Sequence, residues 1–162
     1  MTDVVELHPR LVTNVFQALR VRRLRNTCRA YLTNYREAIA VRQQIRWFYA
    51  TYRKLLQAGE YRIYLYAAGR SRSVGYGALH LQEGRLYITE CVETTQRGRG
   101  YGTAILKHLL AAAQGKPVIA EIWASNQASI ALHTRAGFVL TSRREHHGEE
   151  LLVFTHGSAP DA

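Results

Sequence analysis

Long hydrophobic runs are missing from this sequence, and so are the cysteine patterns of disulfide-rich or zinc-binding domains. The 162 residues contain no apolar stretch near the roughly 20 residues that a membrane helix requires. The two cysteines, Cys28 and Cys91, are too few for a disulfide framework, and no Cys/His cluster has zinc-site spacing. The first ten residues lack the basic-then-apolar order of a secretory signal. We therefore expect a cytoplasmic protein that engages neither a metal nor a membrane.

Acidic residues are also scarce, because 12 Asp and Glu stand against 22 Lys and Arg, which gives a formal net charge of +10. A basic surface attracts polyanions such as nucleic acid, an anionic membrane or a phosphorylated small molecule. Many of the arginines lie between Arg10 and Arg53 at helical spacings, which is equally the pattern of a solvated helix face. Charge alone does not decide between these interpretations.

The composition is otherwise that of an ordinary globular domain, with 47% apolar and 21% charged residues. We expect one domain over residues 1–156 and a loose tail over 157–162. Period-two and helical patterns alternate along the chain and predict the order β, α, α, β, β, β, α, β, α, β, β. The clearest segments are a strand at 4–7, helices from Thr13 and over 38–57, strands at 62–68, 74–81 and 85–92, a helix at 101–113, a strand at 117–124 and a helix at 126–136.

The loop between the strand at 85–92 and the helix at 101–113 is the most informative segment. It contains two arginines, Arg97 and Arg99, and a glycine at every second position from Gly98 to Gly102. Glycines let a backbone approach a ligand closely, and the N–H groups at a helix start point toward it. The loop therefore suits a pyrophosphate, although its spacing differs from the Walker and dinucleotide-binding loops. The same sequence is also compatible with an ordinary glycine-rich turn that binds no ligand.

This loop, Arg97-x-x-Gly100-x-Gly102 after a strand ending in Val92, resembles the acetyl-CoA loop of the GNAT superfamily of N-acetyltransferases. The segment from Asn126 to Phe138 is similar to the second signature of that family, which begins with Asn and ends with Gly-Phe. The resemblance implies an α/β (α+β) GNAT fold: a mixed, mostly antiparallel seven-stranded sheet, splayed between strands 4 and 5, with helices on both faces. It also implies acetyl-CoA as cosubstrate and no metal.

The same resemblance implies which positions bind the cofactor. Backbone groups of Cys91 and Val92, at the splayed strand edge, would bind the pantetheine arm, and Asn126 would contact that arm. The pyrophosphate would lie on the residues of the glycine loop and of the helix start, which are Arg97, Gly98, Arg99, Gly100, Tyr101, Gly102 and Thr103.

A catalytic base is expected because an attacking ammonium must first lose its proton. Glu121 is the only charged residue of its apolar strand, where partial desolvation favours proton uptake. The run from Glu121 to Asn126 also looks like that of ribosomal-protein alanine acetyltransferases, in which the glutamate is the base. Glu90 is the second candidate, since other branches of the family use a glutamate on that strand. A simple ion pair of Glu121 with an arginine is the alternative.

His133 occupies the position at which many members of the family have a tyrosine that protonates the departing CoA thiolate. Histidine can donate a proton near neutral pH, so the resemblance makes His133 the candidate general acid. A packing role on its helix is the alternative. One of the ten tyrosines is another candidate for the acid.

We therefore predict an acetyl-CoA-dependent N-acetyltransferase that acts on a primary amine of a small molecule, such as an amino sugar or an amino acid. The alternative is the same chemistry on a protein N-terminus or lysine, with a peptide amine as substrate. From another class, a non-catalytic basic module could bind nucleic acid or a protein partner. Nucleic acid is disfavoured because the arginines and aromatics between Arg42 and Arg53 follow helical spacing, not that of a base-stacking platform. The oligomeric state stays open, with a homodimer among the options.

Overall fold

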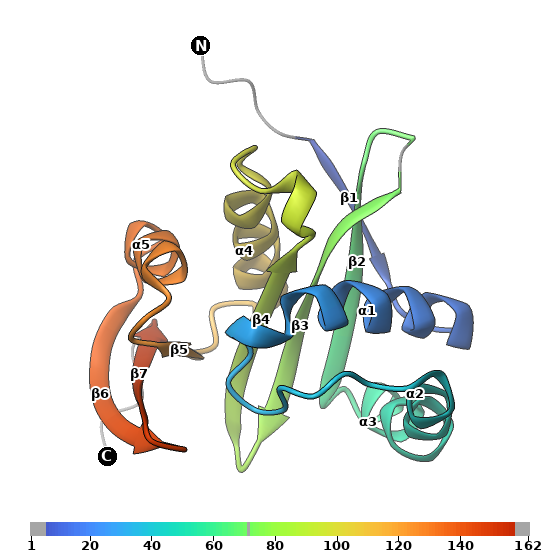
Figure 1. Ribbon diagram of the computed structural model, residues 1–162, viewed down its shortest axis with the longest axis horizontal. Helices are drawn as coiled ribbons and strands as arrows, with labels where there is room; N and C mark the ends of the chain where they lie inside the picture. The colour runs from blue at the N-terminus through green and yellow to red at the C-terminus, as the bar shows by residue number, and fades with distance from the viewer. Residues whose placement is uncertain (1–5, 71, 158–162) are drawn as a thin grey trace.

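The computed structural model of the protein describes residues 6–70 and 72–157. Within these residues, seven strands form one sheet in the order β1-β2-β3-β4-β5-β7-β6 (Figure 1). Neighbouring strands are antiparallel except for β4 and β5, which are parallel. The predicted fold class is confirmed. The strands are β1 Leu7–Leu11, β2 Tyr61–Ala68, β3 Ser73–Gln82, β4 Arg85–Val92, β5 Val118–Trp123, β6 Val139–His146 and β7 Glu149–His156.

The α-helices are α1 Val15–Cys28, α2 Val41–Trp47, α3 Arg53–Gln57, α4 Tyr101–Ala112 and α5 Gln127–Arg135. The helix predicted over 38–57 consists of α2, a π-helical turn at Phe48–Tyr52, and α3. The Tyr52 hydroxyl in that turn is buried and donates to the carbonyl of Val12, while the amide of Ile63 donates to it. None of the helices in the described ranges is long and apolar enough to cross a bilayer.

The helices cover both faces of the sheet, as its alternating side chains require. One face of β3 and β4, which includes Tyr76, Ala78 and Cys91, packs against α1 and the π-helical turn. The opposite face, with Leu79 and Ile88, packs against α4. In Figure 1, α1 crosses in front of the central strands and α4 lies behind them.

The first strand differs from the prediction in position. A strand was expected over residues 4–7, but β1 begins at Leu7, pairs with β2 from Leu7↔Ala68 to Leu11↔Tyr64, and includes Pro9. Proline lacks the N–H of a ladder, yet an edge strand tolerates it on its solvent side. Residues 4 and 5 of the expected strand, and residues 158–162 of the expected tail, lie outside the described residues.

Two glycines of β3 allow α4 to lie close against the sheet. A Cβ atom on Gly75 would lie 2.4 Å from the carbonyl oxygen of Cys91 on β4 and 3.0 Å from a methyl of Ile105 on α4, and a Cβ on Gly77 would lie 2.7 Å from a methyl of Leu109 on α4. The first neighbour is backbone and cannot rotate away. Close packing at Gly75 therefore fixes the end of β4 relative to α4, and with it the start of the glycine loop.

Replacing Gly75 with alanine should destabilise the fold because β4 must shift to relieve this contact. We expect Gly75→Ala to lower the free energy of unfolding by about 2 kcal/mol, within the usual range for overpacking. Urea unfolding followed by circular dichroism would measure it. The control is Gly84→Ala, at a turn with φ of +75° and open space around the Cβ position. That change should cost about 1 kcal/mol of backbone strain, and an equal loss in both variants would contradict the packing argument.

Candidate active site

A cavity of about 830 Å³ lies where β4 and β5 separate. In the described part of the chain, these two strands pair at Leu86↔Val118 and Tyr87↔Ile119, near the start of each. Beyond these pairs the strands diverge (Figure 1), so the edge of β4 that faces β5 is unpaired from Ile88 to Val92. Cys91 and Val92, predicted to bind the pantetheine arm, line the cavity at this edge.

The glycine loop closes one end of the cavity. Gly98 and Gly100 have φ values of +76° and +78°, a conformation that glycine adopts without strain. The helix α4 begins at Tyr101, and within the described residues no side chain caps it. The first N–H groups of α4 are therefore available to an anion, and the helix dipole favours one there.

Most of the predicted cofactor positions line this cavity. Arg97, Gly98, Gly100, Tyr101, Gly102, Thr103 and Asn126 are among its lining residues, whereas Arg99, alone of the described positions that we assigned to the cofactor, is not. Asn126 also has a local role, because its side-chain oxygen accepts a hydrogen bond from the amide of Ser129 at 3.2 Å and caps α5. The lining residues fit a pyrophosphate at the loop.

Glu90 and His133, from β4 and α5, meet inside the cavity wall. The Nε2 atom of His133 lies 3.5 Å from an oxygen of Glu90, and the imidazole is 1% exposed. Its Nδ1 lies 2.9 Å from the carbonyl oxygen of Ser129, and because a carbonyl only accepts, Nδ1 carries the hydrogen. Nε2 therefore faces the carboxylate. Burial opposes the charged imidazolium, but the Glu90 carboxylate and the Ser129 carbonyl outweigh it and raise the pKa of His133.

Glu121, the other predicted base, has a different environment. Its carboxylate accepts a hydrogen bond at 2.5 Å from the guanidinium of Arg144 on β6, and it is partly exposed. Glu121, Arg144, Glu90 and His133 all line the same cavity. The fold thus brings the three predicted catalytic side chains together, and the arginine partner considered for Glu121 is Arg144.

Sequence reasoning missed one segment of the cavity wall, which is the connection between α1 and α2. Leu32, Thr33 and Asn34 line the cavity, and the indole of Trp123 donates to the carbonyl of Leu32 at 3.0 Å. Arg36 pairs with Glu149 of β7 at 2.6 Å and lies over the ring of Trp123. The segment has no periodicity, so its place could not be predicted from local pattern.

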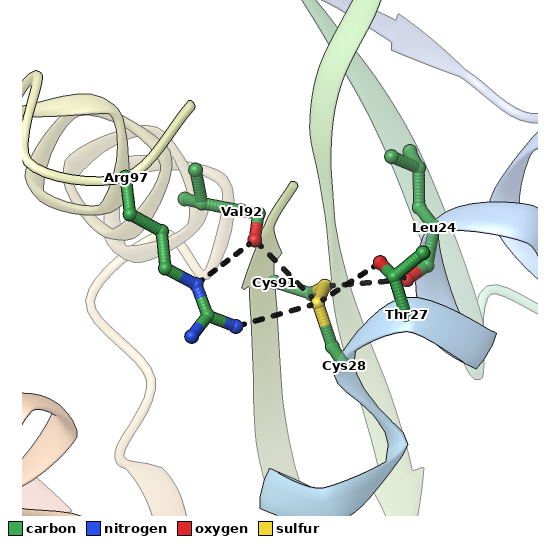
Figure 2. The surroundings of a disulfide bond; sticks show 6 residues. All are labelled: Leu24, Thr27, Cys28, Cys91, Val92 and Arg97. Atoms are coloured by element: carbon green, nitrogen blue, oxygen red, sulfur yellow. Dashed lines mark hydrogen bonds between the residues drawn. A yellow bond between two sulfur atoms is a disulfide. The ribbon is translucent and has the colours of Figure 1, made fainter. Parts of the chain in front are cut away.

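Sequence reasoning also missed that Cys28 and Cys91 are joined in a disulfide (Figure 2). The bond links the last residue of α1 to β4, 63 positions apart. The spacing of two isolated cysteines in the sequence does not predict a bond between them. Only the folded structure shows that they lie close enough to form one. Arg97 reaches the same place, since its guanidinium contacts the sulfur of Cys28 and the carbonyl of Val92.

Comparison with known proteins identifies the family. Residues 21–138 match the sequence model of the Acetyltransferase (GNAT) family. The chain belongs to the GNAT acetyltransferase family. Both the predicted family and the predicted enzyme class, an N-acetyltransferase, are confirmed. Within the described residues, no three His, Cys, Asp or Glu side chains are grouped so as to hold a metal ion.

Solved structures share the fold at low sequence identity. The yncA protein of Salmonella typhimurium, solved with its cofactor acetyl-CoA, is 21% identical, with a TM-score of 0.75 over 96% of this chain and 98% of that one. A ribosomal-protein-alanine N-acetyltransferase from Brucella melitensis is 21% identical, with a TM-score of 0.76 over 93% and 99%. Spermidine N-acetyltransferase from Vibrio cholerae, solved with CoA and spermine, is 11% identical, with a TM-score of 0.75 over 93% and 94%. No curated protein matches the sequence.

The two loop arginines offer a matched test of the pyrophosphate assignment. Arg97 lines the cavity and Arg99 is outside its lining among the described residues. We expect Arg97→Gln to weaken acetyl-CoA binding about tenfold, because a hydrogen bond to a charged group is lost. Arg99→Gln should change it less than twofold. Isothermal titration calorimetry measures both, and equal effects would contradict the assignment.

Proposed function

We propose that the protein transfers the acetyl group of acetyl-CoA to a primary amine of a small molecule. The observation that carries the proposal is one cavity that joins an anion-binding helix start to a partly buried carboxylate. At one end are the N–H groups of α4 and the glycine loop, suited to a pyrophosphate. Toward the other end is Glu90, suited to an ammonium group and its proton. Glu90 belongs to the unpaired edge of β4, which continues to Val92 next to the loop.

A direct transfer fits this arrangement. The amine nitrogen loses a proton to a carboxylate and attacks the acetyl carbonyl carbon, after which the carbon–sulfur bond breaks and CoA leaves. Glu90 is the better placed base, because Arg144 occupies the carboxylate of Glu121 through a short charged hydrogen bond. We infer that His133 acts chiefly through Glu90, because its Nε2 lies 3.5 Å from that carboxylate, at ion-pair distance.

A small acceptor is favoured by how the cavity is walled. The segment after α1 is attached to β5 through Trp123 and to β7 through the Arg36–Glu149 pair. A protein chain needs an open groove, whereas this cavity is bounded on one side by a tethered segment. Polar lining groups would bind the hydroxyl or carboxylate groups of an amino sugar or amino acid, and they include Thr33, Asn34, Gln82 and Arg144.

An acetyl-transfer screen tests the proposal directly. Release of CoA thiol would be followed with amino sugars, amino acids and polyamines in one set, and with peptide N-termini and lysine peptides in another. We expect turnover in the first set. Turnover confined to peptides would favour a protein acetyltransferase instead. Binding of nucleic acid without any acetyl transfer would favour a basic binding module.

The two carboxylates can be separated by isosteric substitution. Glu90→Gln should lower kcat by about 10²- to 10⁴-fold, the usual contribution of a general base, while leaving the affinity for acetyl-CoA nearly unchanged. Glu121→Gln, the matched control, should lower kcat by less than about tenfold. Steady-state kinetics at saturating acetyl-CoA would measure both. The reverse order of effects would make Glu121 the base.

The Glu90–His133 pair should give the stability a distinct pH dependence. Because the folded-state pKa of His133 is raised above its ordinary value of about 6.5, the imidazolium stabilises the folded protein. That contribution is fully present below the unfolded pKa and is lost as pH rises through the raised pKa. We therefore expect the melting temperature of the wild type, relative to His133→Gln, to fall as the pH rises from about 6.5 through the raised pKa of His133. Calorimetry of both proteins measures this difference, and a constant offset would show that the two side chains are not coupled.

His133→Tyr separates this role from direct proton donation. If His133 protonates the CoA thiolate, a tyrosine there should restore much of the rate that His133→Ala loses. If His133 acts by orienting Glu90, glutamine should restore more than tyrosine, since its amide can donate to the carboxylate. The kcat values of the three variants at saturating substrates decide between the two roles.

A further inference from the structure

We propose that Cys28 and Cys91 form a thiol–disulfide modification site that controls acetyl-CoA affinity through the guanidinium of Arg97. The inference rests on the proposed function, because it takes acetyl-CoA as the ligand. It goes beyond that function by assigning a regulatory role to two side chains that the acetyl transfer does not use.

The two sulfurs lie at the boundary between α1 and the cofactor end of the cavity (Figure 2). Cys28 is the last residue of α1 and is 3% exposed, and Cys91 on β4 is 5% exposed. Both residues line the cavity nonetheless. A small reagent that enters the cavity can therefore approach this pair.

Arg97 is the charged group that contacts this site. Its Nη2 lies 3.8 Å from the sulfur of Cys28, and its Nε donates to the carbonyl of Val92 at 3.4 Å. The same guanidinium lies over the ring of Tyr31, 4.7 Å from the ring centre. Arg97 thus bridges the end of α1 and the glycine loop, and the cofactor's pyrophosphate competes with these partners for its charge.

The oxidation state of the sulfur sets the strength of that competition. In the disulfide the sulfur of Cys28 is neutral and a weak acceptor, so Arg97 is readily available to a pyrophosphate. After reduction, a thiol beside an arginine is favoured as thiolate. The thiolate is a full negative charge in contact with Arg97, and binding acetyl-CoA then requires that ion pair to break. The oxidised protein should bind acetyl-CoA more tightly.

The exchange balances with a low-molecular-weight disulfide, RSSR, as the oxidant. The Cys28 thiolate attacks one sulfur of RSSR, forms a mixed disulfide and releases the first RSH once that thiolate takes up a proton. The Cys91 sulfur then attacks the sulfur of Cys28, forms the protein disulfide and releases the second RSH. In the cytoplasmic setting that we propose, thiols are the resting state. Oxidation is therefore the signal, and tighter cofactor binding is the response.

Calorimetric titration of acetyl-CoA into the wild-type protein tests the proposal, once after dithiothreitol and once after oxidised glutathione. A thiol assay confirms two free thiols in the first sample and none in the second. We expect the reduced protein to bind about two- to fivefold more weakly, the range of a partly exposed ion pair. Because this comparison uses the unaltered chain, it does not depend on how any variant folds.

Two serine variants form a matched pair that separates charge from cross-linking. Neither Cys28→Ser nor Cys91→Ser can form the bond, but only Cys91→Ser keeps a thiol beside Arg97. We expect Cys91→Ser to bind as weakly as the reduced wild type, and Cys28→Ser to bind as tightly as the oxidised one. Arg97→Gln should bind weakly in both redox states and lose the difference between them.

Three results would overturn the inference. They are equal affinity of the oxidised and reduced wild type, Cys28→Ser binding as weakly as Cys91→Ser, and a redox difference that survives in Arg97→Gln. No acetyl-CoA binding by any form would instead contradict the proposed function. The two failures are distinguishable because the first set requires measurable binding and the second excludes it.

Discussion

The short parallel pairing of β4 with β5 is the constraint on which the rest of the site depends. Two neighbouring strands in a sheet ordinarily satisfy each other's N–H and C=O groups along their length. Here the pairing covers Leu86 and Tyr87, and the rest of the β4 edge turns toward a cavity. An extended ligand with amide groups can replace the missing strand, as in strand addition by peptides. The close packing of α4 at Gly75 then places the helix start directly beyond that edge.

The cavity also separates charges that would otherwise cancel. The whole chain carries an excess of ten positive charges, yet the Glu90 carboxylate lies in the cavity wall beside His133. An anionic cosubstrate and a cationic acceptor can therefore occupy one continuous space. This arrangement favours a ternary complex, in which both substrates are present when the acetyl group moves.

Local pattern predicted most of the fold and the loop, and non-local pairing accounts for what it missed. The alternation in β2 to β4 and the glycines before α4 are read within short windows, and both predictions matched the structure. The partners of the site residues are distant in sequence: Cys28 with Cys91, Glu90 with His133, Glu121 with Arg144. No window contains both members of such a pair. The position of β1 was missed for a different reason, since Pro9 and the polar residues around it conceal an edge strand.

The two carboxylates of the cavity show why position in a motif does not by itself identify a base. Glu121 stands in the more suggestive sequence, but β6 places Arg144 against it, and an arginine stays protonated throughout the working range of pH. Glu90 faces an imidazole instead, whose charge can change as the reaction proceeds. When Glu90 takes up a proton, its attraction for the imidazolium of His133 weakens. The imidazolium can then release its own proton more readily. The partner of each carboxylate, more than the strand that carries it, therefore decides which one can accept the proton of the amine.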